Sequence, residues 1–191
     1  MASGRSSYGY ERKHQNHLKL IEVMIKDKVP YKLQNCSSMT DAYNLLLSYP
    51  TIGEFLAYQY VTDINYSSLT DFSEMEFVKA GPGAKDGILK CFSNFGDYSF
   101  EDIIRMMAES QEQEFHRLHL DFDTLWGRSL QLIDCQNVFC EVDKYSRLAH
   151  PEIMGYSKRT RIKQKYTCSH SEPIELVFPL KWNINHLTNE V

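Results

Sequence analysis

Residues 77–88 read Phe77-Val78-Lys79-Ala80-Gly81-Pro82-Gly83-Ala84-Lys85-Asp86-Gly87-Ile88. The glycines on either side of Pro82 permit a sharp turn and a close approach of the backbone to a ligand. Ser73 can cap a short helix over 74–79, and helical spacing resumes over 84–92. The stretch predicts two helices joined by a glycine hairpin, whose second helix directs its first amides at an anion such as a phosphate. A plain turn between two helices is the alternative.

Helical periodicity also dominates the rest of the chain. A helix around 18–25 is expected to end at the Val29-Pro30 step, and Ser38 or Thr40 can cap a second helix that stops before Pro50. Further helices are expected over 52–62 after a Thr51/Glu54 capping box, over 100–118 after a Ser99 cap, and over 129–148, with one short strand over 174–178. The predicted fold class is all-α.

The bulk composition fits a globular protein of one domain or two small packed ones. The chain has 191 residues, 42% of them hydrophobic. No apolar run is long enough to span a membrane, and the polar residues 1–10 do not form a secretory signal. The five scattered cysteines are expected to be reduced thiols in a cytoplasmic protein.

The net charge of −4 is unevenly distributed. Residues 97–123 carry eight acids against two arginines, whereas residues 144–165 carry seven lysines and arginines against one acid, Glu152. Because the attraction of a phosphate is local and screened over roughly 10 Å, such a chain can still bind a polyanion on its basic side. A solvated charged surface is the alternative interpretation.

Five segments give the chain a resemblance to a known family. From about residue 49 to residue 185 it resembles the α-glutamyl/putrescinyl thymine pyrophosphorylase family, a branch of the helix-hairpin-helix DNA glycosylase superfamily linked to hypermodified DNA bases. The segments are Gln59-Tyr60-Val61-Thr62-Asp63-Ile64-Asn65-Tyr66, Gly81-Pro82-Gly83-Ala84, residues 134–145 (which begin Asp134-Cys135-Gln136-Asn137-Val138), Arg159-Thr160-Arg161-Ile162-Lys163-Gln164 and Phe178-Pro179-Leu180-Lys181-Trp182.

The resemblance implies a helix-hairpin-helix DNA glycosylase-like fold, with two small helical subdomains flanking a cleft. Residues 1–191 would form one such unit: a helical barrel over about 40–130 with its hairpin at 74–92, and a second lobe made of 10–35 and 130–191. The 51 positions from Gly83 to Asp134 exceed the usual separation in this superfamily. The acidic helix between them therefore resembles an insertion.

The resemblance also implies a DNA site that holds a base flipped out of the duplex. Gln59 is the candidate to fill the gap left in the DNA, and Tyr58, Tyr60, Asp63 and Tyr66 are candidates for the base pocket; for the tyrosines, core packing is the alternative. The remaining candidates contact the DNA backbone: Gly81, Gly83, Ala84 and Lys85 at the hairpin, and Lys158, Arg159, Arg161 and Lys163 in the basic run.

Asp134 is the candidate catalytic carboxylate. Breaking a glycosidic bond develops positive charge on the sugar, which a nearby carboxylate can stabilise; helix capping is the alternative role. Asn137 is expected to orient Asp134. Asp143 is the reserve acid and is expected to pair with Lys144 or Arg147. Lys85 is a candidate for Schiff-base chemistry, with phosphate contact as the alternative.

No resident metal is expected, although three pairs offer ligand types for zinc: His116 with His119, Cys135 with Cys140, and Cys168 with His170. The expected cofactor set is empty, apart from a monovalent cation that the superfamily can hold at its hairpin. No Walker loop, Rossmann fingerprint or serine elbow occurs in the sequence.

Three functions remain open from the sequence. The first is a monofunctional DNA glycosylase that hydrolyses the bond to a hypermodified pyrimidine, for example in anti-phage defence. The second is a transferase that displaces pyrophosphate from an activated 5-hydroxymethyluracil in DNA to attach an amino acid or polyamine. The third is a non-catalytic DNA-binding module. In each case the expected partner is double-stranded DNA with modified bases, and the expected state is a monomer away from membranes.

Overall fold

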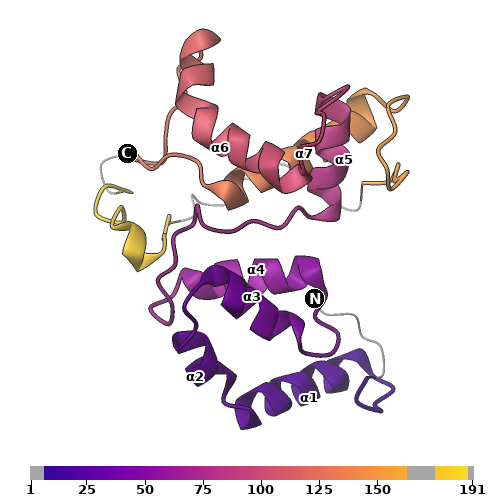
Figure 1. The fold of residues 1–191 in the computed structure, drawn as a ribbon, viewed down its shortest axis with the longest axis vertical. Coiled ribbons are helices and arrows are strands. Elements are labelled where there is room, and N and C mark those ends of the chain that lie inside the picture. The colour runs from indigo at the N-terminus through magenta and orange to yellow at the C-terminus, as the bar shows by residue number, and fades with distance from the viewer. Residues whose placement is uncertain (1–6, 163–174, 189–191) are drawn as a thin grey trace. The chain divides into compact units, whose positions relative to one another are not determined.

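The computed structural model describes residues 7–162 and 175–188, and these form helices and loops without a β-strand (Figure 1). The all-α prediction is therefore confirmed for the described part of the chain. None of its helices is long and apolar enough to cross a membrane. The elements are α1 (Lys13–Lys26), α2 (Val29–Gln34), α3 (Met39–Leu47), α4 (Glu54–Asn65), α5 (Pro82–Cys91), α6 (Phe100–Arg117), α7 (Leu132–Ala149) and a 3-10 turn η1 (Leu180–Trp182).

The chain divides into two compact units. The first comprises Met1–Lys79 with Pro179–Lys181, and the second comprises Ala80–Phe178 with Trp182–Val191. This division separates the chain at residue 79. The lobes inferred from the resemblance remain a prediction.

The first unit is built on α3 and α4, which pack against each other through Ala42, Leu46, Ala57 and Val61, all nearly inaccessible to solvent. The hydroxyl of Ser38 accepts the Asp41 amide and opens α3, as predicted. The predicted Thr51/Glu54 capping box is wrong. Gly53 is the N-cap of α4, and Thr51 adopts a left-handed conformation with φ of 71° in the preceding turn.

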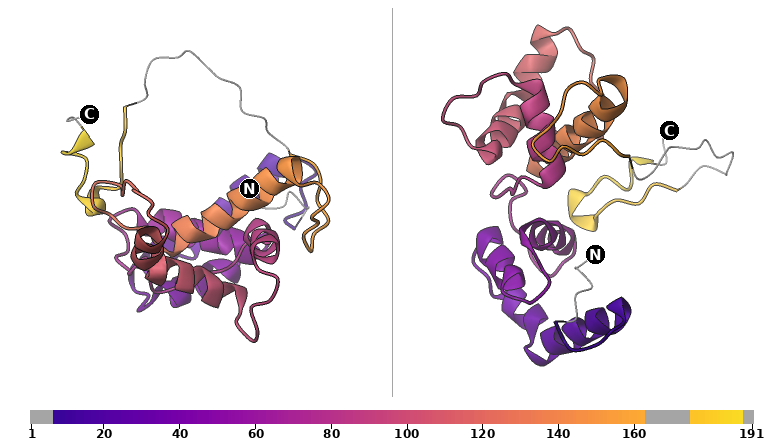
Figure 2. Two further views of the ribbon diagram at one scale, coloured as in Figure 1. Left: turned by 90° about the horizontal axis from the view of Figure 1, so that it is seen from above. Right: turned by 90° about the vertical axis from the view of Figure 1, so that its right-hand side faces the viewer.

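The second unit is organised by the packing of α5 on α7, which lie side by side with α6 against them (Figure 1, Figure 2). Gly87 makes the close approach possible, because a Cβ there would lie 2.0 Å from the carbonyl oxygen of Phe139. Ala84, Ile88 and Leu132 are completely buried around this contact. Helix α6 begins with a capping box of Ser99 and Asp102, so the Ser99 cap is confirmed.

The predicted helix over 74–79 is absent. Residues 74–76 form a single turn and residues 77–81 have no regular secondary structure, so only the second helix of the expected hairpin pair exists. Tertiary contacts account for this: the Glu76 carboxylate accepts the Met39 amide at the start of α3, and the Phe77 ring packs 4.9 Å from Tyr43. The predicted strand is also wrong for its described residues, 175–178; Ile174 lies outside the described part.

Candidate nucleic-acid interface

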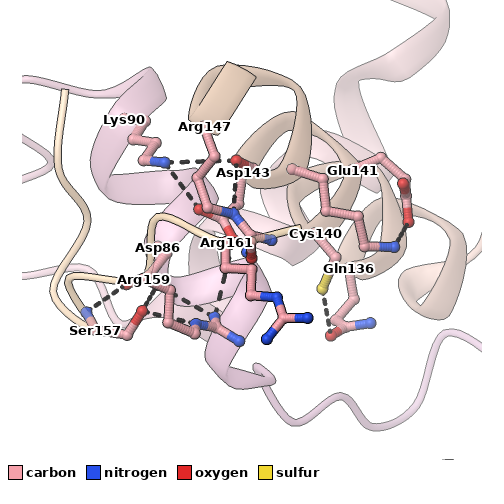
Figure 3. Close-up of polar contacts among 11 residues, drawn as sticks. Asp86, Lys90, Gln136, Cys140, Glu141, Asp143, Arg147, Ser157, Arg159 and Arg161 are labelled. Atoms are coloured by element: carbon pink, nitrogen blue, oxygen red, sulfur yellow. Dashed lines mark hydrogen bonds and ion pairs between the residues drawn. The ribbon is translucent and has the colours of Figure 1, made fainter. Parts of the chain in front are cut away.

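A basic loop follows α7 and folds back onto α5. We call this segment, residues 155–162, the arginine loop. Within it, Ser157 donates from its backbone amide and its hydroxyl to the carboxylate of Asp86. Arg159 Nη2 donates to the same carboxylate over 3.2 Å (Figure 3). Gly155 allows this approach, because a Cβ there would lie 2.7 Å from Asp86 Cγ. Asp86, whose side chain is only 3% exposed, thus anchors the arginine loop.

A second buried carboxylate, Asp143 on α7, joins the two helices to this loop. Lys90 Nζ on α5 lies 2.8 Å from Asp143 Oδ1, and the two side chains are 3% and 1% exposed. Asp143 Oδ2 lies 3.2 Å from Arg147 Nη2 and 3.8 Å from Arg159 Nη2. Arg147 also donates to the backbone carbonyl of Arg161 over 2.6 Å. Because Lys90 and Asp143 have almost no contact with solvent, we assign this pair a structural role.

The predicted pairing of Asp143 with Arg147 is confirmed, whereas Lys144 pairs with Glu141 instead. The arginine loop keeps positive charge at the surface. Lys158 and Arg161 are exposed, and the Arg159 side chain is 44% exposed although it is bonded to Asp86. Guanidinium groups held in this way can donate charge-assisted hydrogen bonds to a phosphate. Lys163, predicted to act with them, lies outside the described residues.

The Asp86 anchor is expected to make folding stability sensitive to acid. Burial acts to raise the pKa of Asp86, but hydrogen bonds from Ser157 and Arg159 outweigh it and hold that pKa below its ordinary value. The stabilisation is thus fully present above the unfolded-state pKa of about 4 and is lost as the pH falls through the folded-state pKa. Urea denaturation between pH 3 and pH 7 should show a shallower acid loss in Asp86→Asn than in the parent chain, and parallel curves would contradict this role.

The start of α5 is packed into the protein interior. The Gly81 amide donates to Oε1 of the fully buried Gln136 over 3.3 Å. A Cβ on Gly83 would meet Cys140 Sγ at 3.0 Å, and Ala84 is completely buried. Lys85 Nζ lies 5.7 Å from the ring centroid of Phe100 on α6, a cation–π contact. The DNA-contact roles assigned to these hairpin residues, and the cation suggested there, remain predictions.

Asp134 occupies the third position of α7 and caps that helix. Its Oδ2 accepts the Gln131 amide over 2.8 Å and Arg128 Nη1 over 3.2 Å. Asn137 is exposed on the same helix and accepts from the Gln136 side chain. Asp134 thus has the helix-capping role that the sequence offered as the alternative to catalysis, and it also forms an ion pair with Arg128.

The candidates on α4 belong to the first unit. Tyr58 is 1% exposed, and its ring lies edge-on to Phe77 with centroids 5.9 Å apart, as in core packing. Gln59 is partly buried, and its Nε2 atom is buried without a hydrogen-bond partner among the described residues. The other candidates, Tyr60, Asp63 and Tyr66, are partly or fully exposed. Their roles toward a flipped base remain predictions.

Metal binding has no geometric support in the described part of the chain. No group of three or more His, Cys, Asp or Glu side chains is placed there to hold an ion. Cys135 is a buried thiol whose pKa is raised to about 11 by burial, which favours the protonated form over the thiolate that zinc requires. Cys168 and His170 lie outside the described residues.

Comparison with known proteins gives one family. The family model described as the helical domain of 5-hmdU DNA kinase matches residues 2–155, which include α1 to α7 and the Asp86–Asp143 anchor. The chain belongs to this helical-domain family. It is 26% identical over 165 residues to the 5-hmdU DNA kinase of Bacillus phage SP10, an alignment that covers 80% of this chain and 26% of that relative. No solved structure matches the chain.

This family corrects the functional predictions. The matching relative is named a kinase of 5-hmdU in DNA, so assignment as a hydrolytic DNA N-glycosylase is wrong. The transferase alternative that displaces pyrophosphate is not supported either, because a kinase transfers a phosphoryl group. The general inference from the resemblance is confirmed, because the chain is related to proteins that act on DNA containing hydroxymethyluracil. The pyrophosphorylase family itself is not the one whose model matches.

The sequence interpretation missed the partners that position the basic run. Asp86 was interpreted only as part of the hairpin, and Lys90 and Ser157 received no role. Helical spacing gave a correct signal only for Arg147, which lies four residues after Asp143 and was predicted as one of its two possible partners. The pairing of Lys90 with Asp143 across two helices has no such local signal.

Proposed function

We propose that this chain is the helical, DNA-holding part of a 5-hmdU DNA kinase and that its arginine loop binds the DNA backbone. The observation that carries the proposal is the loop's anchorage: two buried carboxylates, Asp86 and Asp143, fix a surface from which Lys158, Arg159 and Arg161 extend. Backbone contacts of this kind orient a protein on DNA without reading its sequence. Membership of the helical-domain family supports the choice of DNA as the polyanion.

In this proposal the phosphoryl donor is bound elsewhere. The 191 residues contain no G-x-x-x-x-G-K-[ST] loop, the phosphate cradle of P-loop NTPases. The chain spans about a quarter of the length of the curated relative that it matches. The proposed division of labour therefore assigns substrate DNA to this chain and nucleotide binding to another part of the kinase.

Removing two exposed charges from the arginine loop tests the proposal. In Lys158→Ala/Arg161→Ala, affinity for dye-labelled DNA containing 5-hmdU should fall about tenfold at 0.1 M salt. The slope of log K against log[salt] should also become shallower by about two, because each lost phosphate contact contributes about 0.9. Fluorescence anisotropy over a salt series measures both quantities.

The control is Lys19→Ala/Lys26→Ala. It removes two lysines of α1, a helix of the first unit, where both pair with Glu22. Its affinity and salt slope should match those of the parent chain. Equal loss of affinity in the two double variants would indicate a general charge effect, and unchanged binding in Lys158→Ala/Arg161→Ala would remove the arginine loop from the interface.

A further inference from the structure

A groove of about 650 Å³ opens beside the first turn of α7, at the other end of this helix from the arginine loop. Its volume falls within the range typical of small-ligand pockets. Phe122, Leu125 and Trp126 contribute apolar walls, and Asp123, Arg128 and Asp134 contribute its charged groups. The groove belongs entirely to the second unit.

An aromatic cluster supports this groove. Trp126 lies 5.5 Å from Phe178 at an interplanar angle of 64°, and Phe178 stacks on Trp182 with centroids 6.1 Å apart. The Arg128 guanidinium lies 3.9 Å from the centre of the Trp182 ring. Trp126 also adopts a left-handed φ of 48°, a conformation that costs an L-residue energy and is held here by the turn that ends at Arg128. Flat, pre-positioned rings of this kind stack well on a nucleobase.

The polar edge of the groove suits a pyrimidine imide. Arg128 and the Gln131 amide both bond to Oδ2 of Asp134, whereas Oδ1 has no hydrogen-bond partner among the described residues. Asp134 is therefore able to accept one more donor, and its side chain is 31% exposed. The guanidinium of Arg128 bonds to Asp134 and lies over the Trp182 ring, so it places a positive charge at this edge of the groove. Uracil presents a complementary edge, one N–H flanked by two carbonyl oxygens.

We propose that this groove receives a 5-hydroxymethyluracil base extruded from the DNA. The base stacks against Trp126, its imide N–H donates to Asp134 Oδ1, and a carbonyl oxygen faces the positive charge of Arg128. The inference rests on the proposed DNA-holding function and adds the part of the DNA that is recognised. Extrusion would bring the hydroxymethyl group clear of the duplex, as in other enzymes that act on a flipped base, and a pocket that holds the base would keep it there.

The two tryptophans of the chain make the groove directly observable. Trp126 and Trp182 are the only tryptophans in the sequence, and both lie in this cluster, so intrinsic emission reports on this place alone. The experiment uses the 191-residue chain and two dye-labelled DNAs that differ only at one position, which holds either 5-hmdU or an abasic analogue. Anisotropy of the dye measures binding, and tryptophan emission measures occupancy of the groove.

We expect both DNAs to bind and only the 5-hmdU DNA to quench tryptophan emission strongly. Trp126→Ala should weaken binding of the 5-hmdU DNA about tenfold and leave the abasic DNA unaffected. Trp126→Phe, which keeps a stacking ring, should stay within about threefold of the parent. Tyr98→Ala, which removes a ring exposed elsewhere on the unit, is the matched control.

The outcomes separate this inference from the function on which it rests. If both DNAs bind but emission does not change, or changes equally for the two, the base pocket is refuted and the DNA-holding function stands. If anisotropy detects no binding of either DNA, both are refuted. Circular dichroism shows whether Trp126→Ala still folds. Near-parent binding by Trp126→Phe, which keeps a ring, then assigns the loss in Trp126→Ala to stacking.

Discussion

Asp143→Ala is expected to lower the free energy of unfolding by roughly 3–5 kcal/mol, the usual effect of breaking a buried ion pair from one side. The substitution leaves Lys90 Nζ, on a side chain that is 3% exposed, without the carboxylate 2.8 Å away. Arg147 also loses the oxygen that lies 3.2 Å from its guanidinium. Urea denaturation followed by circular dichroism measures the change, and a loss below about 1 kcal/mol would contradict the assigned role.

A matched control lies two residues away on the same helix. Glu141 pairs with Lys144 at the surface, with side chains 66% and 51% exposed, so Glu141→Ala should change stability by at most about 0.5 kcal/mol. The combined variant Lys90→Met/Asp143→Leu replaces the buried pair by apolar groups. It should recover a large part of the loss, because no uncompensated charge then remains at the Lys90 position.

Gly87→Ala is expected to cost at least about 3 kcal/mol, beyond the ordinary range for overpacking, because the obstacle is backbone. The added Cβ would lie 2.0 Å from the Phe139 carbonyl oxygen and 2.7 Å from its carbon. Helices α5 and α7 would therefore have to separate. The midpoint of urea denaturation reports the loss.

Gly83→Ala is the natural comparison, one turn earlier on α5. Its Cβ would lie closest to a side-chain atom, Cys140 Sγ at 3.0 Å, which can move, and the nearest backbone atom, Cys140 Cα, would be 3.6 Å away. Alanine also favours the helical conformation by up to about 1 kcal/mol over glycine. The expected change is within about 1 kcal/mol of zero. Equal losses in the two variants would show that contact with the backbone is not what makes Gly87 necessary.

The parts of the fold that sequence could predict are those with local causes. Apolar periodicity and the caps at Ser38 and Ser99 placed α3 and α6 within one or two residues, because a cap acts on amides within its own first turn. The predicted helix over 74–79 is wrong because the cause of the observed conformation is not local. The conformation of these residues is set by contacts of Glu76 and Phe77 with α3, which no local propensity encodes.

The candidate site divides in the same way. The basic run was visible as composition, since residues 144–165 concentrate lysine and arginine. The anchors were not, because Asp86 lies 71 positions from Ser157 and meets it only after α5 and α7 pack. For Asp134 the sequence predicts both a catalytic role and helix capping, and the capping bond to the Gln131 amide is local, whereas the ion pair with Arg128 was not predicted. The family comparison was needed to overturn glycosidic cleavage, because it matches the chain to the helical domain of 5-hmdU DNA kinase.

Helix α7 carries the groove beside Asp134 near its first turn and the arginine-loop contact of Arg147 near its last. Thirteen residues separate these two side chains, so at about 1.5 Å per residue they are offset by roughly 20 Å along the helix axis. A DNA strand advances about 3.4 Å per nucleotide, which makes this offset about six nucleotides. If the arginine loop holds phosphates and the groove holds the base, as proposed, the length of this continuous helix would fix which nucleotide in the strand reaches the groove.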